Sequence, residues 1–182
     1  MTWIFRLSCG PAHGLIGGAL ALAAAAPPVL AAECPFLSRE QAAAALTALP
    51  PAPRVADETP PVKAGELKRM RTCYFSLPND GIGLLTVMVA EFDSPAAAQA
   101  AFERQRKSAP EGVRNLKGLG RAAFMASSGG GRFADTTYVL LDHRLLRVNH
   151  VLGKAAKAAI ERDPDGAVIG THEIARQVLK RL

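Results

Sequence analysis

Residues 84–92 read LLTVMVAEF, and this stretch decides the fold of the chain. Alternate residues of an extended strand point to opposite faces, and both faces are mostly apolar here. A strand of this kind lies in the middle of a sheet and is covered on both sides. We therefore expect a central strand, with Leu85, Val87 and Val89 on one face and Leu84, Thr86, Met88 and Ala90 on the other.

Three helices are predicted around this strand, and each has a recognisable start. Ser94 and Pro95 follow the strand directly, as an N-cap and a first-turn proline that open a helix reaching about residue 108. Ser38 and Gln41 have the spacing of a capping box, and Thr171 can cap a last helix. The expected apolar stripes are Ala42, Ala45, Leu46 and Leu49 in the first, Ala98, Ala101 and Phe102 in the second, and Ile174, Ala175, Val178, Leu179 and Leu182 in the third.

The rest of the chain alternates between strand-like stretches and loops. Residues 50–65 contain five prolines and no periodicity, so the first helix should end at Pro50 and an extended loop should follow. A second loop is expected at 110–120, while 154–170 reads as helix or turn. Further strands are predicted at 66–77, 122–126, 136–141 and 145–152, the last two as a hairpin around 142–144.

These elements predict an α+β fold. Short connections favour antiparallel neighbours, and helices must cover the apolar sheet. We expect one antiparallel sheet of four to five strands covered by about three helices. The element order also fits a diverged repeat of a unit made of a strand pair and a helix.

Residues 1–31 read as an export signal. Arg6 precedes an uncharged apolar run, 15–26, that is too short to span a bilayer. Two prolines end the run, and small residues follow at the expected cleavage site after Ala31, with Ala32 as the alternative. The other interpretation is an uncleaved N-terminal anchor. Residues 32–182 should then form one periplasmic or secreted domain without a transmembrane segment.

Two cysteines remain after removal of Cys9 with the signal. Cys34 and Cys73 are an even pair in an oxidising compartment, which favours a disulfide. A redox role is the alternative, although the pair lacks the Cys-x-x-Cys spacing. Lipid attachment at Cys34 is not expected, because Glu33 separates it from the small residue Ala32.

Charge and composition argue against nucleic acid as a partner. The net charge is +6 for the whole chain and +5 without residues 1–31, which contain Arg6. The basic residues are scattered and are not interleaved with aromatic residues, as in nucleic-acid-binding surfaces. They indicate solvated faces, and the alternative is attraction to an anionic envelope surface.

Motifs that would hold a cofactor or metal are not found in the sequence. Gly118–Ala123 matches the letters of the dinucleotide fingerprint, but it precedes a strand, so a tight turn is the better interpretation. His143, His150 and His172 have no neighbours at metal-ligand spacing. We therefore predict no cofactor, no metal and no catalytic residue.

An enzyme remains the alternative in a different class. A small hydrolase or transferase could assemble its site from residues distant in sequence. The least implausible polar cluster for it is His150 with Arg147 and Asn149.

Three segments resemble a known family: CPFLS at 34–38 before an alanine-rich helix, CYF at 73–75, and LKGLGRAA at 116–123. They are similar to a domain-of-unknown-function family of small secreted, actinobacterial-type envelope lipoproteins. The resemblance implies an α+β fold, a Cys34–Cys73 disulfide and a role in binding.

The sequence thus predicts an exported, non-catalytic accessory or binding protein of the periplasm or cell envelope. Its partner would be a protein or small molecule that the sequence does not identify. A structural subunit of an envelope complex is a further alternative, which a contiguous exposed apolar patch would indicate.

Overall fold

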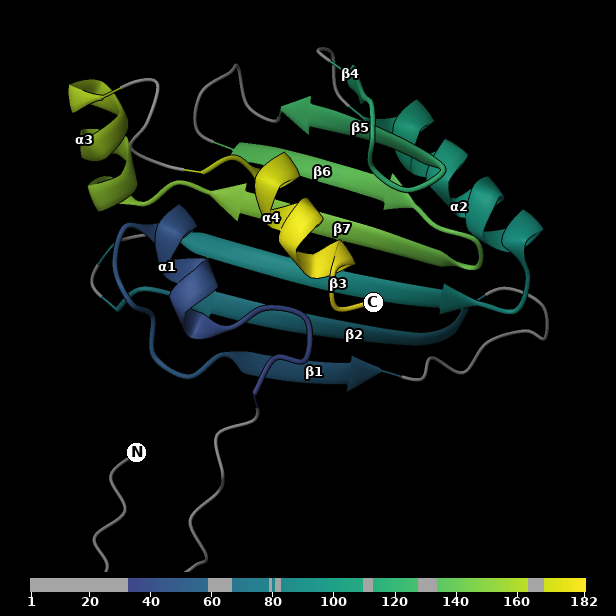
Figure 1. Cartoon of the computed structure of the whole chain (residues 1–182), viewed down its shortest axis with the longest axis horizontal. Coiled ribbons are helices and arrows are strands. Elements are labelled where there is room, and N and C mark those ends of the chain that lie inside the picture. Colours follow the sequence, from purple (N-terminus) through teal and green to yellow (C-terminus); the bar gives the residue numbers. More distant parts are fainter. Residues whose placement is uncertain are drawn as a thin grey trace, which may run out of the picture.

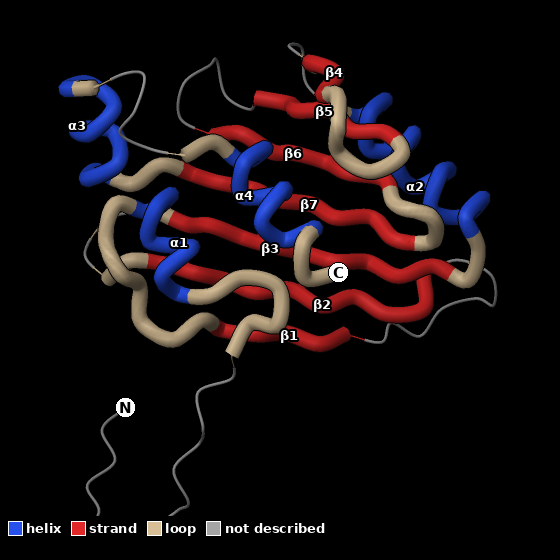
Figure 2. The backbone as a smooth tube through the Cα atoms, in the orientation of Figure 1, coloured by secondary structure: helices blue, strands red, loops and turns tan. Residues whose placement is uncertain are grey.

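The structure, a computed structural model, describes residues 33–58, 67–78, 80, 83–109, 113–127, 134–163 and 169–182. The predicted signal, 1–31, and its cleavage site lie outside the described residues. Helices and strands form an α+β domain with one open antiparallel sheet (Figures 1 and 2). The helices are α1 (Arg39–Leu46), α2 (Pro95–Ser108), α3 (Lys154–Arg162) and α4 (Thr171–Leu179).

Seven strands form the described sheet, in the order β1-β2-β3-β7-β6-β5-β4. They are β1 (Arg54–Glu58), β2 (Leu67–Ser76), β3 (Leu84–Phe92), β4 (Arg114–Leu116), β5 (Ala122–Ser127), β6 (Ala134–Leu140) and β7 (Arg144–Val151). The prediction of an antiparallel α+β sheet is confirmed, but four to five strands and three helices were too few. The expected strand-pair units are instead a three-strand and a four-strand meander.

β3 lies in the centre of the sheet, as its sequence predicts. It pairs with β2 on one side and with β7 on the other, where Val87 lies opposite Val148 and Val89 opposite Leu146. These side chains are buried under α1 and α4, which cover what we call the front face (Figure 1). The front core also contains Leu37, Phe75, Leu85 and Ile174, each at most 1% exposed.

The opposite, back face is covered only in part. α2 packs its predicted stripe against the C-terminal end of β3 and against β5, β6 and β7. Phe124 is fully buried there, with its ring edge-on to Phe102 at 5.2 Å and stacked on Tyr138 at 4.7 Å. Thr86 and Met88 of β3 are only half-buried, so part of the back face stays accessible beside α2.

The first helix begins as predicted and ends earlier. Ser38 and Gln41 form both hydrogen bonds of the capping box. The helix ends at Leu46, because Thr47 takes a left-handed conformation with φ 66°. Leu49, which we expected in the apolar stripe, is 55% exposed.

Two short strands lie where loops were predicted. β1 interrupts the proline-rich 50–65 segment and pairs with β2 along all five of its residues. β4 interrupts the 110–120 loop and pairs with β5 at the other edge of the sheet. Both are mainly exposed edge strands held by main-chain pairing, so they lack the apolar alternation that identifies a strand in sequence.

The region 154–170, predicted as helix or turn, contains α3. The N-terminus of this helix is held by a residue distant in sequence. Its N-cap, Gly153, has no side chain, and the Asp80 carboxylate accepts instead from the Ala155 amide at 2.8 Å. A Cβ at Gly153 would lie 1.9 Å from Asp80 Oδ2, so this position requires glycine. Residues 164–168 lie outside the described residues.

The last helix is confirmed, but its cap is different. Gly170 is the N-cap of α4, and Thr171 is its buried first residue. The Thr171 hydroxyl hydrogen-bonds to that of Thr137 on β6 at 2.8 Å, so it ties the helix to the sheet rather than capping it.

The glycine motif at 118–123 is the expected tight turn. Gly118 and Gly120 both have positive φ, and a Cβ at Gly120 would lie 2.4 Å from the Leu140 carbonyl oxygen. β5 follows at Ala122, so the turn leads into an antiparallel strand. A dinucleotide-binding turn would instead open a helix. Of the helices described, none has the length and apolarity to cross a membrane.

Candidate functional site

Cys34 and Cys73 are bonded to each other. Their Cα atoms lie 5.8 Å apart, within the usual range for a disulfide. Both residues are buried in the front core, and the bond fastens the segment before α1 to β2. This burial fits a structural bridge, since reactive cysteines are accessible.

The predicted polar cluster of β7 is divided by the sheet. Arg147 and Asn149 point to the back face, where they pair with Met88 and Thr86 of β3. His150 has the opposite parity and lies on the front face, opposite Leu85 and Asp135. The three side chains therefore cannot form one site.

His150 is a buried, neutral histidine. It is 4% exposed, and burial lowers its pKa to about 4, an effect that the nearby Asp135 partly opposes. Its Nε2 atom is buried without a partner among the described residues. A cavity of about 120 Å³ beside it is also lined by Asp135, Gly170 and Thr171.

The His150 cavity contains residue types found in catalytic sites, but they do not form the hydrogen-bonded chain that a catalytic triad needs. Asp135 is the carboxylate that could orient the histidine, yet it accepts a hydrogen bond from the Ser127 hydroxyl at 2.6 Å. A serine nucleophile needs to be bonded to the histidine and the histidine to the carboxylate. The Thr171 hydroxyl is already bonded to Thr137. The hydroxyls of Ser127 and Thr171 are therefore bonded to Asp135 and Thr137 rather than to His150.

A larger groove lies on the back face between the C-terminal end of α2 and strands β6 and β7. Its volume is about 300 Å³. Its polar lining residues are Gln105, Ser108, Thr136, Tyr138, Arg147 and Asn149. The groove has the size of a small-molecule site.

Arg147 is the central charged residue of this groove. Its guanidinium lies 5.8 Å from the centre of the Tyr138 ring, within the range of a cation–π contact. Its Nε atom is buried without a hydrogen-bond partner, and it forms no ion pair within the described part of the chain. A buried unpaired donor on a charged group costs about 1–3 kcal/mol or more, and the same side chain also brings its positive charge to the lining of the groove.

Asn149 lies beside Arg147 on the same face of β7. The Thr136 hydroxyl donates to Asn149 Oδ1 at 3.1 Å, which fixes the amide. The amide NH₂ group is then available as a second donor in the groove. Together Arg147 and Asn149 supply positive charge and oriented donors next to an aromatic ring.

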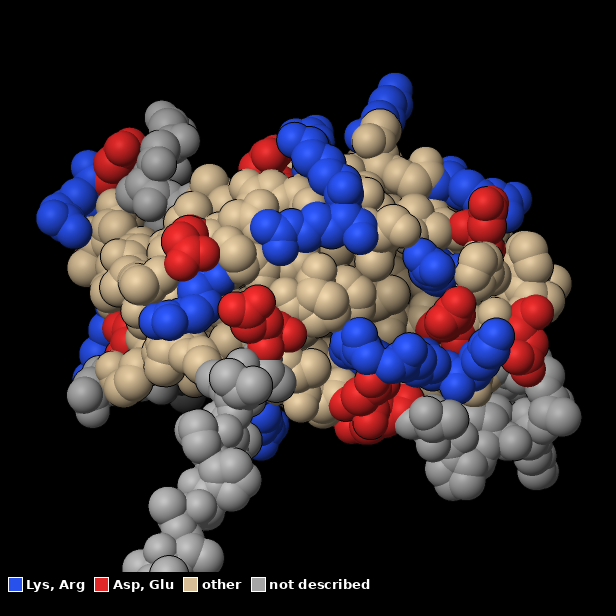
Figure 3. All heavy atoms as spheres, turned by 60° about the horizontal axis from the view of Figure 1, so that its bottom comes forward, with Lys and Arg blue, Asp and Glu red and all other residues tan. Residues whose placement is uncertain are grey.

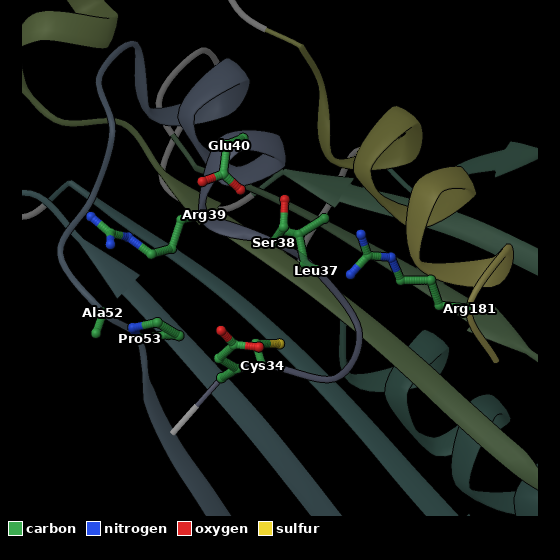
Figure 4. A pocket seen from close by; sticks show the side chains of 9 residues that line it. Cys34, Leu37, Ser38, Arg39, Glu40, Ala52, Pro53 and Arg181 are labelled. Atoms are coloured by element: carbon green, nitrogen blue, oxygen red, sulfur yellow. The ribbon is translucent and has the colours of Figure 1, made fainter. Parts of the chain in front are cut away.

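A third hollow, also of about 300 Å³, lies beside the disulfide (Figure 4). Glu33 and Glu40 line it together with Arg39 and Arg181. Arg39 already donates to the Pro50 carbonyl at 2.8 Å, while hydrogen bonds from the main-chain amide of Glu40 itself and from Ser38 lower the pKa of the Glu40 carboxyl. Because the hollow carries charges of both signs, it selects no class of ligand.

His143 and His172 lie apart from these hollows. His143 is half-exposed and lies 3.4 Å from Glu91, and His172 is the second residue of α4. In the described ranges, no three histidine, cysteine, aspartate or glutamate side chains are grouped closely enough to hold a metal ion.

Comparison with known proteins gives no assignment. No family model matches the chain, and no curated protein is significantly similar to it. The resemblance to secreted envelope lipoproteins therefore stays a prediction.

Proposed function

We propose that this protein is an exported, non-catalytic binding protein of the periplasm or cell envelope that holds a small anionic ligand in the back-face groove. The observation that carries the proposal is the unpaired Arg147 in a groove of about 300 Å³. Arginine binds carboxylates through two parallel hydrogen bonds, and charge-assisted bonds of this kind are the strongest that a side chain makes.

The ligand class follows from the residues around Arg147. Tyr138 supplies an aromatic surface, and the Asn149 amide supplies donors next to the guanidinium. A carboxylate attached to a planar or apolar group would use all three. A neutral ligand would leave the arginine charge without a counter-ion.

The location rests on two observations. The sequence of residues 1–31 has the pattern of an export signal. The Cys34–Cys73 disulfide is typical of proteins that fold in an oxidising compartment. The resemblance to secreted envelope proteins points the same way.

The test is titration of the purified chain with benzoate and with its neutral analogue benzamide, followed by calorimetry. We expect benzoate to bind with a Kd of about 1 mM or tighter and benzamide at least tenfold more weakly. Arg147→Met should remove about 1.5–3 kcal/mol of binding free energy, since it deletes a charged hydrogen bond. The matched control is Arg104→Met, an exposed arginine on α2.

Two results would contradict the proposal. One is equal binding of benzoate and benzamide. The other is benzoate binding that Arg147→Met leaves unchanged, while circular dichroism shows that the variant folds.

The hydrolase or transferase alternative has one observation in its favour, the shared cavity of His150 and Asp135. It predicts that p-nitrophenyl ester hydrolysis by the protein is lost in His150→Gln. The structural-subunit alternative has less support, because Leu49 and Val113 are the large apolar side chains that the described residues expose.

A further inference from the structure

A second group of cationic side chains lies on the front face, on the opposite side of the sheet from Arg147. Arg69 and Arg71 of β2, Arg144 of β7 and Arg181 after α4 surround a cleft of about 210 Å³. Figure 3 shows Lys and Arg side chains gathered in a band along the side of the molecule formed by the β1 edge, with Asp and Glu beside it.

Part of this charge is already neutralised. Asp57 accepts hydrogen bonds from both Arg69 and Arg71, and these bonds hold the pKa of its carboxyl far below the ordinary value. Glu91 lines the cleft 3.9 Å from Arg144, and it also lies 3.4 Å from His143.

Positive charge nevertheless exceeds negative charge at the cleft. Four arginine side chains surround the cleft, and the side-chain carboxylates paired with three of them are those of Asp57 and Glu91, so basic side chains outnumber acidic ones here. Arg144 also donates a hydrogen bond to the main-chain oxygen of Leu182 at 3.2 Å, so one of its N–H groups is already used. Arg181 has no side-chain partner within the described part of the chain.

The unused donors are arranged for an anion with several oxygens. Arg181 offers a complete guanidinium fork, and each of the other three arginines keeps N–H groups that its partners do not use. They approach from different elements around one cleft. Phe36 and Val89 form its apolar wall, which excludes water from one side of these donors.

Phosphate fits this cleft better than carboxylate does. A phosphate group has at least two charged oxygens in a tetrahedral arrangement, so it can accept from guanidinium groups on several sides. The cleft is roughly seven times the volume of a water molecule in the liquid, which leaves room for one phosphate group.

We propose that this arginine-lined cleft binds a phosphate group, either of a soluble phosphate ester or of an anionic lipid headgroup. The site is independent of the proposed function, because it lies on the opposite face of the sheet and shares no residue with the Arg147 groove.

Two probes distinguish the sources. Glycerol 3-phosphate is titrated by calorimetry, and binding to phosphatidylglycerol-containing phosphatidylcholine vesicles is measured by co-sedimentation. Binding of the ester alone identifies a soluble phosphate ligand, and stronger binding to vesicles identifies a lipid surface. Failure of both probes to bind overturns the proposal.

Three variants connect the binding to the cleft. Arg181→Gln should weaken binding of whichever probe binds by about five- to tenfold, and Glu91→Gln should strengthen it by a few fold, because each changes one charge at the site. Arg176→Gln is the matched control, since Arg176 lies on α4 and pairs with Glu173 at 2.9 Å. The proposal is also overturned if Arg181→Gln and Arg176→Gln weaken binding equally, or if Glu91→Gln weakens it.

The two anion sites can be tested apart. Arg147→Met should leave glycerol 3-phosphate or vesicle binding unchanged, and Arg181→Gln should leave benzoate binding unchanged. If the unaltered protein binds glycerol 3-phosphate or the vesicles but does not bind benzoate, the proposed function is refuted and the phosphate site stands. If it binds benzoate but neither phosphate probe, the phosphate site is refuted and the proposed function stands.

Discussion

Acidification should destabilise this protein through His150. The side chain is 4% exposed, and burial lowers its pKa to about 4 in the folded protein. In the unfolded chain an imidazole has a pKa of about 6.5. Because the unfolded state then binds the proton more readily, the free energy of unfolding is highest above pH 6.5 and falls as the pH drops toward 4. These two values give a loss of about 2 kcal/mol at pH 5 and about 3 kcal/mol at pH 4.

Urea unfolding at about pH 7.5 and about pH 5 measures this loss. His150→Gln cannot gain a proton, so its difference between the two pH values should be smaller than that of the wild type by about 2 kcal/mol. Asp57 does not affect the comparison between these two pH values. A carboxyl whose pKa is lowered by folding stabilises the protein until the pH falls below its pKa in the unfolded chain, which is about 3.9.

The control for this experiment is His172→Gln, which removes an imidazole from the start of α4. If the burial of His150 is the cause, the loss of stability between the two pH values should be the same in His172→Gln as in the wild type. Equal losses of stability in the wild type and in His150→Gln between the two pH values would refute the reasoning.

Three further changes have predicted magnitudes. Replacing Cys34 and Cys73 together by alanine should lower the free energy of unfolding by about 4 kcal/mol, because the bridge closes a long loop, and urea unfolding with and without reductant checks this. Phe124→Ala should cost about 3–5 kcal/mol in the same assay, since it leaves a cavity between Phe102 and the sheet; a cost below 1 kcal/mol would mean that the back core is loosely packed. Ser38→Ala should cost about 1 kcal/mol through loss of the capping box, whereas Ser38→Asp should retain most of it.

The sequence predicted those helices and strands whose own residues contain a diagnostic pattern. β3 has two apolar faces, α2 has a serine and proline at its start, and α1 has a capping box. All three begin where the sequence places them, although α1 ends at Leu46 rather than at Pro50. The disulfide followed from the count of cysteines and the expected compartment. In each case the decisive residues are neighbours in the chain.

The missed elements depend on partners elsewhere. β1 and β4 become strands through main-chain pairing with β2 and β5, which short polar segments do not reveal. The start of α3 depends on Asp80, more than seventy residues earlier in the chain.

The candidate sites show the same division. Strand alternation alone separates Arg147 and Asn149 from His150, so that signal was present in the sequence. The arginine cleft had no such signal, because its residues come from β2, β7 and the segment after α4.

The central pairing of β3 with β7 also governs when the protein can fold. The meander that ends with β3 is complete at Phe92, but its partner strand begins only at Arg144. A chain synthesised at about 5–20 residues per second would expose the unpaired edge of β3, and the part of its front face that α1 does not cover, for several seconds before β7 arrives. α4, which closes the front core against α1, arrives later still. The half-made sheet is therefore the stage at which this chain most needs protection from aggregation, by a chaperone or by being kept unfolded.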